Sequence, residues 1–188
     1  MSIDIEIDTD TEAGTGIDTR ADAATAYAAR PIPTAVLAEL RASDDAGSAP
    51  VPYADAEGGA PLRCCLRSSA VGERIALVSY APLRRWAAEA GAEPGAYDEQ
   101  GPVFVHAEEC GGPAPSGTYP FERVGALRAV RRYDAGGRIV GGRLLELPEV
   151  PREGFDRAFA EAFADPAVTL VHVRAVEYGC FQFEVRRP

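Results

Sequence analysis

Apolar and polar residues alternate along this chain with two different periods. A repeat of three to four residues predicts helices over residues 31–43, 82–90 and 152–164. In the third segment, Phe155, Phe159 and Phe163 recur at every fourth position, which is typical of a helix face packed on a core. Pro82 suits a first helical turn, and Gly91 stands where a C-terminal cap is expected.

Shorter apolar or alternating runs predict strands at residues 62–67, 74–81, 103–108, 127–133, 138–147, 169–176 and 181–185. The glycines at 136 and 137 predict a hairpin turn, and Gly141 and Gly142 indicate a bulge or a close backbone approach. Strands outnumber helices and the helices fall irregularly among them. The pattern predicts one α+β domain over residues 31–188, with about three helices and a mostly antiparallel or mixed sheet.

Residues 1–30 form an acidic segment ahead of this domain, with seven acidic residues and two arginines. We expect a poorly packed N-terminal extension there. The alternation of Ile3, Ile5 and Ile7 with acidic residues leaves an edge strand as the alternative.

The amino-acid composition excludes several kinds of chemistry and argues against some partners. The 188 residues contain neither lysine nor asparagine, so a lysine Schiff base, a P-loop lysine and N-linked glycosylation are excluded. The net charge of -10 argues against nucleic acid as the main partner. We find neither a membrane-spanning stretch nor a secretory signal, which predicts a cytoplasmic protein without membrane contact.

The only two histidines lie in two similar apolar runs, and each shares a strand face with a charged residue. His106 and Glu108 would point the same way, and so would His172 and Arg174. Glu108 could orient the imidazole of His106 for proton transfer, while Arg174 could bind an anion beside His172. The alternatives are a surface ion pair for the first two, and a core histidine with a surface arginine for the second.

Further candidates come from the cysteines and from residues near the strands. Cys180 follows a glycine after a strand and could serve as a nucleophile, although a buried inert thiol is the alternative. Cys64 and Cys65 would point to opposite faces of a strand and would not share a site. Arg63 and Tyr80 are candidate substrate-binding residues, with a surface charge as the alternative for Arg63.

Several separated motifs resemble one bacterial family. They are Arg63-Cys64-Cys65-Leu66, Ser79-Tyr80-Ala81-Pro82, Gly101 to Glu108, Arg132-Tyr133-Asp134, Gly137 to Val140, His172 and Gly179-Cys180. In this order they resemble the uncharacterised proteins catalogued as domain of unknown function 1203, over residues 30–187. The resemblance implies a one-domain cytoplasmic protein and brings no established activity.

Together these observations predict a cofactor-independent enzyme of isomerase, lyase, cyclase or hydrolase type that acts on a small anionic metabolite. His106, Glu108, His172 and Cys180 would be its catalytic residues, and Arg63, Arg174 and Tyr80 its substrate-binding residues. No metal is expected, although His106, Glu108 and His172 could supply a two-histidine, one-carboxylate set. A homodimer is compatible with the chain. The alternative is a non-catalytic small-molecule-binding or accessory protein, and the distance between the two histidines separates the two hypotheses.

Overall fold

Three α-helices form in the segments where the sequence predicts them. The computed structural model describes residues 26–188, in which the helices are α1 (Thr34–Ala42), α2 (Pro82–Ala90) and α3 (Pro151–Ala164), with a 3-10 turn η1 (Gly95–Tyr97). Proline occupies the first turn of α2 and of α3. Gly91 ends α2 in the left-handed conformation, with φ of 67°, which glycine adopts without a steric penalty.

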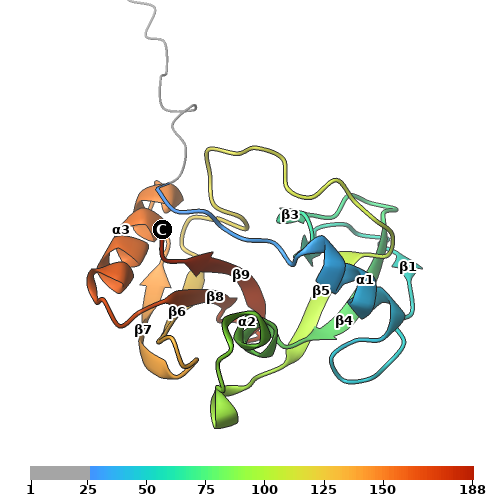
Figure 1. The fold of residues 1–188 in the computed structure, drawn as a ribbon. Coiled ribbons are helices and arrows are strands. Elements are labelled where there is room, and N and C mark those ends of the chain that lie inside the picture. Colours follow the sequence, from blue (N-terminus) through green and yellow to red (C-terminus); the bar gives the residue numbers. More distant parts are fainter. Residues whose placement is uncertain (1–25) are drawn as a thin grey trace, which may run out of the picture.

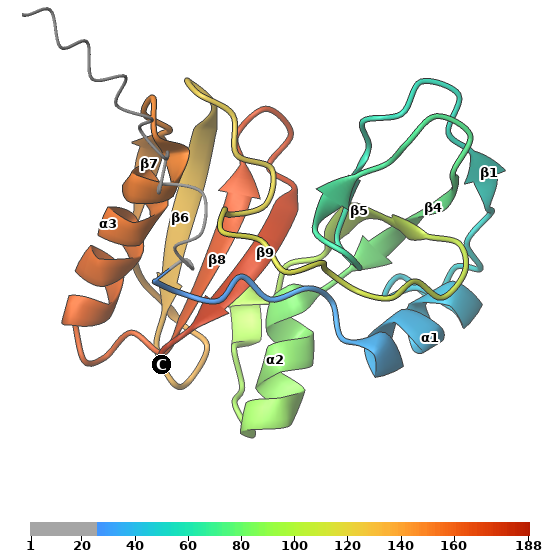
Figure 2. The same cartoon turned by 90° about the horizontal axis from the view of Figure 1, so that it is seen from above.

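The strands form two sheets that stand side by side (Figures 1 and 2). The first is mixed, with the order β1-β4-β5-β2-β3, and consists of β1 (Tyr53–Ala54), β2 (Pro61–Leu62), β3 (Arg67–Ser68), β4 (Arg74–Tyr80) and β5 (Gly101–His106). The second is antiparallel, with the order β7-β6-β8-β9, and consists of β6 (Leu127–Tyr133), β7 (Ile139–Glu146), β8 (Leu170–Ala175) and β9 (Phe181–Arg186). The predicted α+β class is therefore confirmed, with two sheets in place of one.

The single strand predicted over residues 62–67 is wrong. Pro61–Leu62 and Arg67–Ser68 pair as a hairpin, and residues 63–66 form the turn between them. The amide of Leu66 donates to the carbonyl of Leu62 at 2.9 Å, and Leu66 has a φ of 58°. A tight turn of apolar and charged residues reads as a strand in the sequence because glycine and proline, the usual turn residues, are missing from it.

The predicted hairpin of β6 and β7 is confirmed. A close approach of the two backbones explains why glycine occupies position 142. A side chain at this position would place its Cβ 2.9 Å from the carbonyl oxygen of Val130 on β6. The two strands also shift register between Arg132 and Tyr133, as expected for a bulge near the paired glycines.

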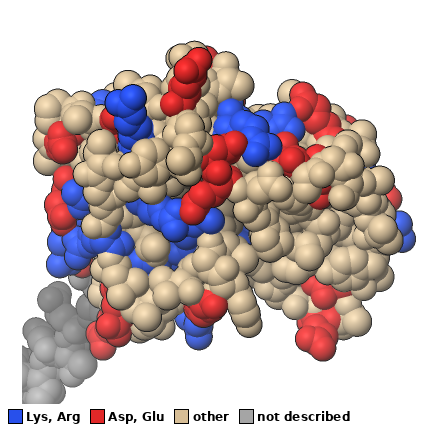
Figure 3. Space-filling view, turned by 90° about the horizontal axis from the view of Figure 1, so that it is seen from below, with Lys and Arg blue, Asp and Glu red and all other residues tan. Residues whose placement is uncertain are grey.

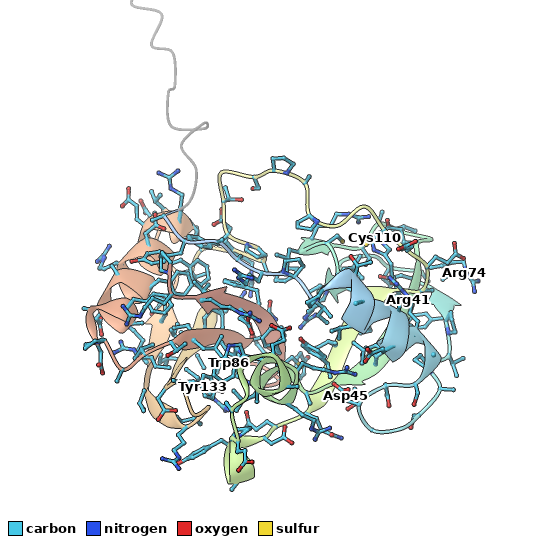
Figure 4. The ribbon with its side chains drawn as sticks, in the orientation of Figure 1. Arg41, Asp45, Arg74, Trp86, Cys110 and Tyr133 are labelled. Atoms are coloured by element: carbon cyan, nitrogen blue, oxygen red, sulfur yellow. The ribbon has the colours of Figure 1, made fainter. Side chains whose placement is uncertain are left out.

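Each helix covers a different apolar surface. The phenylalanines of α3 pack on the antiparallel sheet, where Phe155 and Phe159 are fully buried against Phe183 of β9. Leu37 and Leu40 of α1 belong to the core of the mixed sheet. Trp86 of α2 packs with Tyr133 of β6, as Figure 4 shows. The helix α2 therefore packs at the junction between the two sheets.

The folded domain begins before residue 31, because Tyr27 and Arg30 already contact it. Tyr27 stacks on Phe163 with ring centroids 5.6 Å apart, and the amide of Arg30 donates to the carbonyl of Glu184 at 2.8 Å. The edge strand considered for Ile3, Ile5 and Ile7 lies outside the described residues.

Among residues 26–188, no helix is both long and apolar enough to span a bilayer. Basic and acidic side chains are interspersed on the face in Figure 3.

Candidate functional site: a cysteine–histidine cluster

The order of the mixed sheet brings three separate segments to one edge. β2 runs parallel to β5, with Leu62 opposite Phe104, so the chain leaves both strands at the same edge. The turn after β2 therefore lies beside His106, the last residue of β5. β4 runs antiparallel to β5, with Ile75 opposite His106, which places Glu73 at the same edge.

Four potential metal-ligating side chains meet at this edge. One donor atom from each of Cys64, Cys65, His106 and Cys110 lies within 4.8 Å of every other. The sulfurs of Cys64 and Cys65 are 4.0 Å apart, and the Nδ1 atom of His106 lies 3.2 Å from the first and 3.7 Å from the second. We call these four residues the Cys/His cluster. Cys110 reaches it from the irregular segment after β5, labelled in Figure 4.

The expectation that Cys64 and Cys65 cannot share a site is wrong. It assumed an extended strand, in which neighbouring side chains point to opposite faces. Both cysteines instead lie in the turn between β2 and β3, where the backbone rotates and brings both sulfurs to the same side.

The three thiols differ in how their surroundings treat a negative charge. The amide of His106 donates to Cys64 at 3.3 Å. Burial raises the pKa of Cys110, and the nearby amide of Gly112 offsets part of that effect. A hydrogen bond from the Cys64 thiol lowers the pKa of Cys65, and the same bond together with burial raises the pKa of Cys64. Thiolate is the form in which cysteine ligates metals and acts as a nucleophile.

The carboxylate beside His106 is Glu73, not Glu108. Nε2 of His106 lies 3.4 Å from Oε1 of Glu73, which also forms an ion pair of 2.5 Å with Arg67. This ion pair holds the pKa of Glu73 well below its usual range. β5 ends at His106, so strand alternation no longer applies to Glu108. The Glu108 side chain is 81% exposed and lies 3.8 Å from Arg74.

Arg41 of α1 fixes the segment that leads from β5 to Cys110. Its guanidinium donates to the carbonyls of His106, at 3.1 Å, and of Glu108, at 2.8 Å. Figure 4 shows Arg41 on α1 below Cys110, with Arg74 to one side. Arg41 therefore holds the backbone of one cluster member, His106, and of Glu108, two residues before Cys110.

A cavity of about 760 Å³ adjoins the cluster at Cys65. Its walls are residues 65–68 and the segment 112–122, apart from Gly117, with Ala28 and Ala29. Leu66 and Phe121 both line it, and both have positive φ, of 58° and 56°. Such strain in non-glycine residues is found preferentially at functional sites.

The second predicted histidine, His172, lies in the other sheet. It is fully buried on β8, with its ring 4.9 Å from that of Tyr133 and 5.2 Å from that of Phe181. Nε2 lies 3.4 Å from the carboxylate of Glu184. His106 and His172 thus belong to different sheets and have different partners, and the structure does not bring them together.

Burial of His172 predicts a specific pH dependence of stability. Desolvation lowers the pKa of His172 below 6.5, against the opposing effect of Glu184, so the folded protein keeps a neutral imidazole while the unfolded chain takes up a proton. We therefore expect the free energy of unfolding to fall by up to about 1.4 kcal/mol per pH unit below pH 6.5. Urea titrations of the wild type and of His172→Gln between pH 7 and pH 5 would measure it. Equal slopes for both proteins would contradict this prediction.

The remaining predicted residues are scattered. Arg63 is 2% exposed and donates from Nε to the carbonyl of Phe181 at 2.8 Å, a bond that joins the two sheets. Burial lowers the pKa of Arg63 to about 10. Cys180 is half-buried and lies outside the Cys/His cluster. Arg174 contacts Glu99 at 3.2 Å and donates to the carbonyl of Gly179.

Tyr80 is buried at the end of β4, where it lines a second, smaller cavity between the sheets. The sequence-based interpretation missed Glu73 and the association of Cys64, Cys65 and Cys110 with His106. The spacing of His106 and Cys110 was a usable signal. Glu73 gave no such signal, since it is 33 positions away from His106 in the sequence.

The fold and the cluster define a two-sheet α+β protein in which two buried and two half-buried side chains that could ligate a metal lie together. The chain belongs to the family described as protein of unknown function (DUF1203), which it matches over residues 59–187. All four members of the Cys/His cluster lie within this range. No curated protein and no solved structure matches the chain.

Proposed function

We propose that this protein binds one zinc ion through Cys64, Cys65, His106 and Cys110. The observation that carries the proposal is the mutual distance of the four donor atoms. A tetrahedral zinc site with ordinary bond lengths needs sulfurs about 3.8 Å apart and sulfur–nitrogen distances of about 3.6 Å. The sulfurs of Cys64 and Cys65 are 4.0 Å apart, and the two sulfur–nitrogen distances are 3.2 and 3.7 Å.

The surroundings of the donors support the same conclusion. Nδ1 of His106 faces the sulfurs, so with a metal on Nδ1 the proton would lie on Nε2, which is 3.4 Å from Oε1 of Glu73. The guanidinium of Arg67 lies 3.3 Å from the same Nε2 and can only donate, so it would have to turn toward Glu73 alone when the metal is bound. A carboxylate behind a ligating histidine fixes the ring and raises its basicity. The pKa of Cys65 is lowered by the hydrogen bond from Cys64, and the amide of His106 donates to Cys64, while zinc itself would displace the thiol protons of the other ligands. Three sulfurs and one nitrogen favour zinc over the hard cations magnesium and calcium.

A site with four protein ligands is closed, which is typical of structural rather than catalytic zinc. The zinc would tie Cys110, in the irregular segment between β5 and β6, to the turn between β2 and β3. Since residues 112–116 and 118–122 of that segment also line the larger cavity, the metal would set the shape of this cavity.

Metal content measures the proposal directly. Protein expressed without a histidine tag and purified under reducing conditions should contain about one zinc per chain by elemental analysis, with iron, nickel and copper assayed in parallel. Cys110→Ser should reduce the zinc content to well below stoichiometry. Cys180→Ser is the matched control, because Cys180 is also half-buried but lies outside the cluster, and it should retain the metal.

Glu73→Gln tests the carboxylate behind His106. Removing such a partner should weaken zinc binding by about 10- to 100-fold, measured by competition with a chromogenic chelator. The zinc proposal is wrong if the reduced wild type carries no metal and binds none when Zn²⁺ is added.

A second candidate function rests on the one cluster residue that lines the larger cavity. Cys65 faces this cavity, Nδ1 of His106 lies 3.7 Å from its sulfur, and Glu73 lies behind the imidazole. Without a metal this order of groups would suit a thiolate nucleophile with its base and orienting carboxylate. Iodoacetamide distinguishes the two functions. A free nucleophile would be alkylated rapidly at Cys65 in protein as purified, whereas a zinc-bound thiolate would react only after chelation.

The acid–base enzyme expected from the sequence requires both histidines at one small-molecule site. Its catalytic set lies in two sheets, so the proposed function does not use it. Binding of a small molecule without catalysis is compatible with either cavity.

A further inference from the structure

A second cavity lies at the junction of the two sheets, away from the Cys/His cluster. It has a volume of about 220 Å³, and none of its lining residues belongs to the cluster. The segment before α1, the end of β4, the helix α2 and the strand β9 form its walls. Figures 1 and 2 show α2 beside β9 and the segment before α1 running across that strand. Junctions between structural units are common places for small-molecule sites.

The hydroxyl of Tyr80 opens into this cavity and forms no hydrogen bond with the part of the chain that the structure describes. Tyr80 is 6% exposed, and its ring packs edge-on against Phe181 at 5.6 Å. Burial and the nearby carboxylate of Glu184 raise the pKa of Tyr80, so the phenol stays protonated. The hydroxyl is therefore a donor that a ligand in the cavity can use, beside walls that are largely apolar.

Of the three arginines that line the cavity, Arg30 forms no ion pair within residues 26–188. Arg85 contacts Asp45 and Glu39, and Arg186 contacts Glu184 and Glu89, so both are neutralised by acidic side chains. The backbone of Arg30 is fixed by its hydrogen bond to Glu184, whereas its side chain is exposed and pairs with no acidic side chain of the described residues. Arg30 is thus the cation available to an incoming anion.

The remaining lining is mainly apolar. Ile32, Trp86 and Phe181 are each at least 95% buried, and several prolines complete the walls. From these three features we propose that the cavity binds a small monocarboxylic acid with a compact aliphatic or aromatic body. The carboxylate contacts the guanidinium of Arg30 and accepts a hydrogen bond from Tyr80, and the body packs against Trp86 and Phe181.

Benzoate and isovalerate are suitable probes, and benzamide is the matched neutral control. A ligand of about nine non-hydrogen atoms with ordinary efficiency binds with a Kd of about 10 mM or tighter, which NMR titration of the full-length protein can measure. We expect benzoate to bind at least about tenfold more tightly than benzamide. Arg30→Gln should reduce benzoate binding to the level of the amide, and Tyr80→Phe should weaken it about fivefold.

Arg157→Gln is the control variant, because Arg157 is an exposed arginine on α3 that does not line the cavity. It should leave the benzoate affinity unchanged. Tyr80→Phe keeps the ring and its packing, and circular dichroism verifies its fold. The proposal is overturned if benzoate and benzamide bind equally, if Arg30→Gln leaves the affinity unchanged, or if neither acid binds at about 10 mM. None of these outcomes depends on the zinc content of the protein.

Discussion

Removing the proposed zinc is expected to lower the melting temperature by about 10 °C. A ligand present at a thousand times its Kd stabilises the folded state by about 4 kcal/mol, and each kcal/mol shifts the melting temperature of a chain of this length by about 2–4 °C. The four donors connect the β2–β3 turn, the end of β5 and the segment that carries Cys110. Without the metal, the thiolates of the cluster lose the cation that holds these segments together.

Differential scanning calorimetry with and without a zinc chelator would measure this shift. Cys110→Ser supplies the control, because a variant that has already lost the metal should melt at the same temperature in both conditions. Re-addition of Zn²⁺ to the chelated wild type should restore the original value. If the wild type loses its zinc and melts unchanged, the metal has no structural role and the assignment of a closed structural site is wrong.

The largest effect of a core substitution is expected at Phe159. Its ring is fully buried on α3 and contacts the rings of Tyr27, Tyr119, Phe155 and Phe183. Phe159→Ala removes this ring and leaves a cavity that the sheet beneath cannot fill, at a cost of about 3–5 kcal/mol. Chemical denaturation monitored by circular dichroism would measure the loss.

Tyr178→Ala is the matched control for Phe159→Ala. Tyr178 is 89% exposed in the loop between β8 and β9, so its removal should change the free energy of unfolding by less than about 0.5 kcal/mol. Similar losses for the two variants would show that the stability of this protein does not depend on the aromatic face of α3.

The structure confirms the sequence-based prediction wherever the signal was local. The period of Phe155, Phe159 and Phe163 depends only on helical geometry, and α3 forms there. Pro82 and Gly91 mark both ends of α2 through their own backbone preferences. The prediction failed over residues 62–67, where a turn without glycine or proline leaves no compositional signal.

The candidate site was predicted only in part, because its geometry depends on pairing between distant segments. His106 was identified as chemically important, yet its carboxylate partner proved to be Glu73 rather than Glu108. That change follows from the end of β5 at His106 and from the antiparallel register of β4. Neither the register nor the parallel pairing of β2 with β5 can be read from the local pattern of residues.

The sequence by itself determined the helices, most strands, the α+β class and the importance of His106, because these depend on periodicity and composition over short windows. The tertiary structure alone decided which side chains meet. It placed His172 in a buried aromatic core and His106 among three cysteines, since the two histidine strands belong to different sheets. Two runs that look alike in sequence therefore have different chemistry, because the side chains around each histidine come from distant parts of the chain.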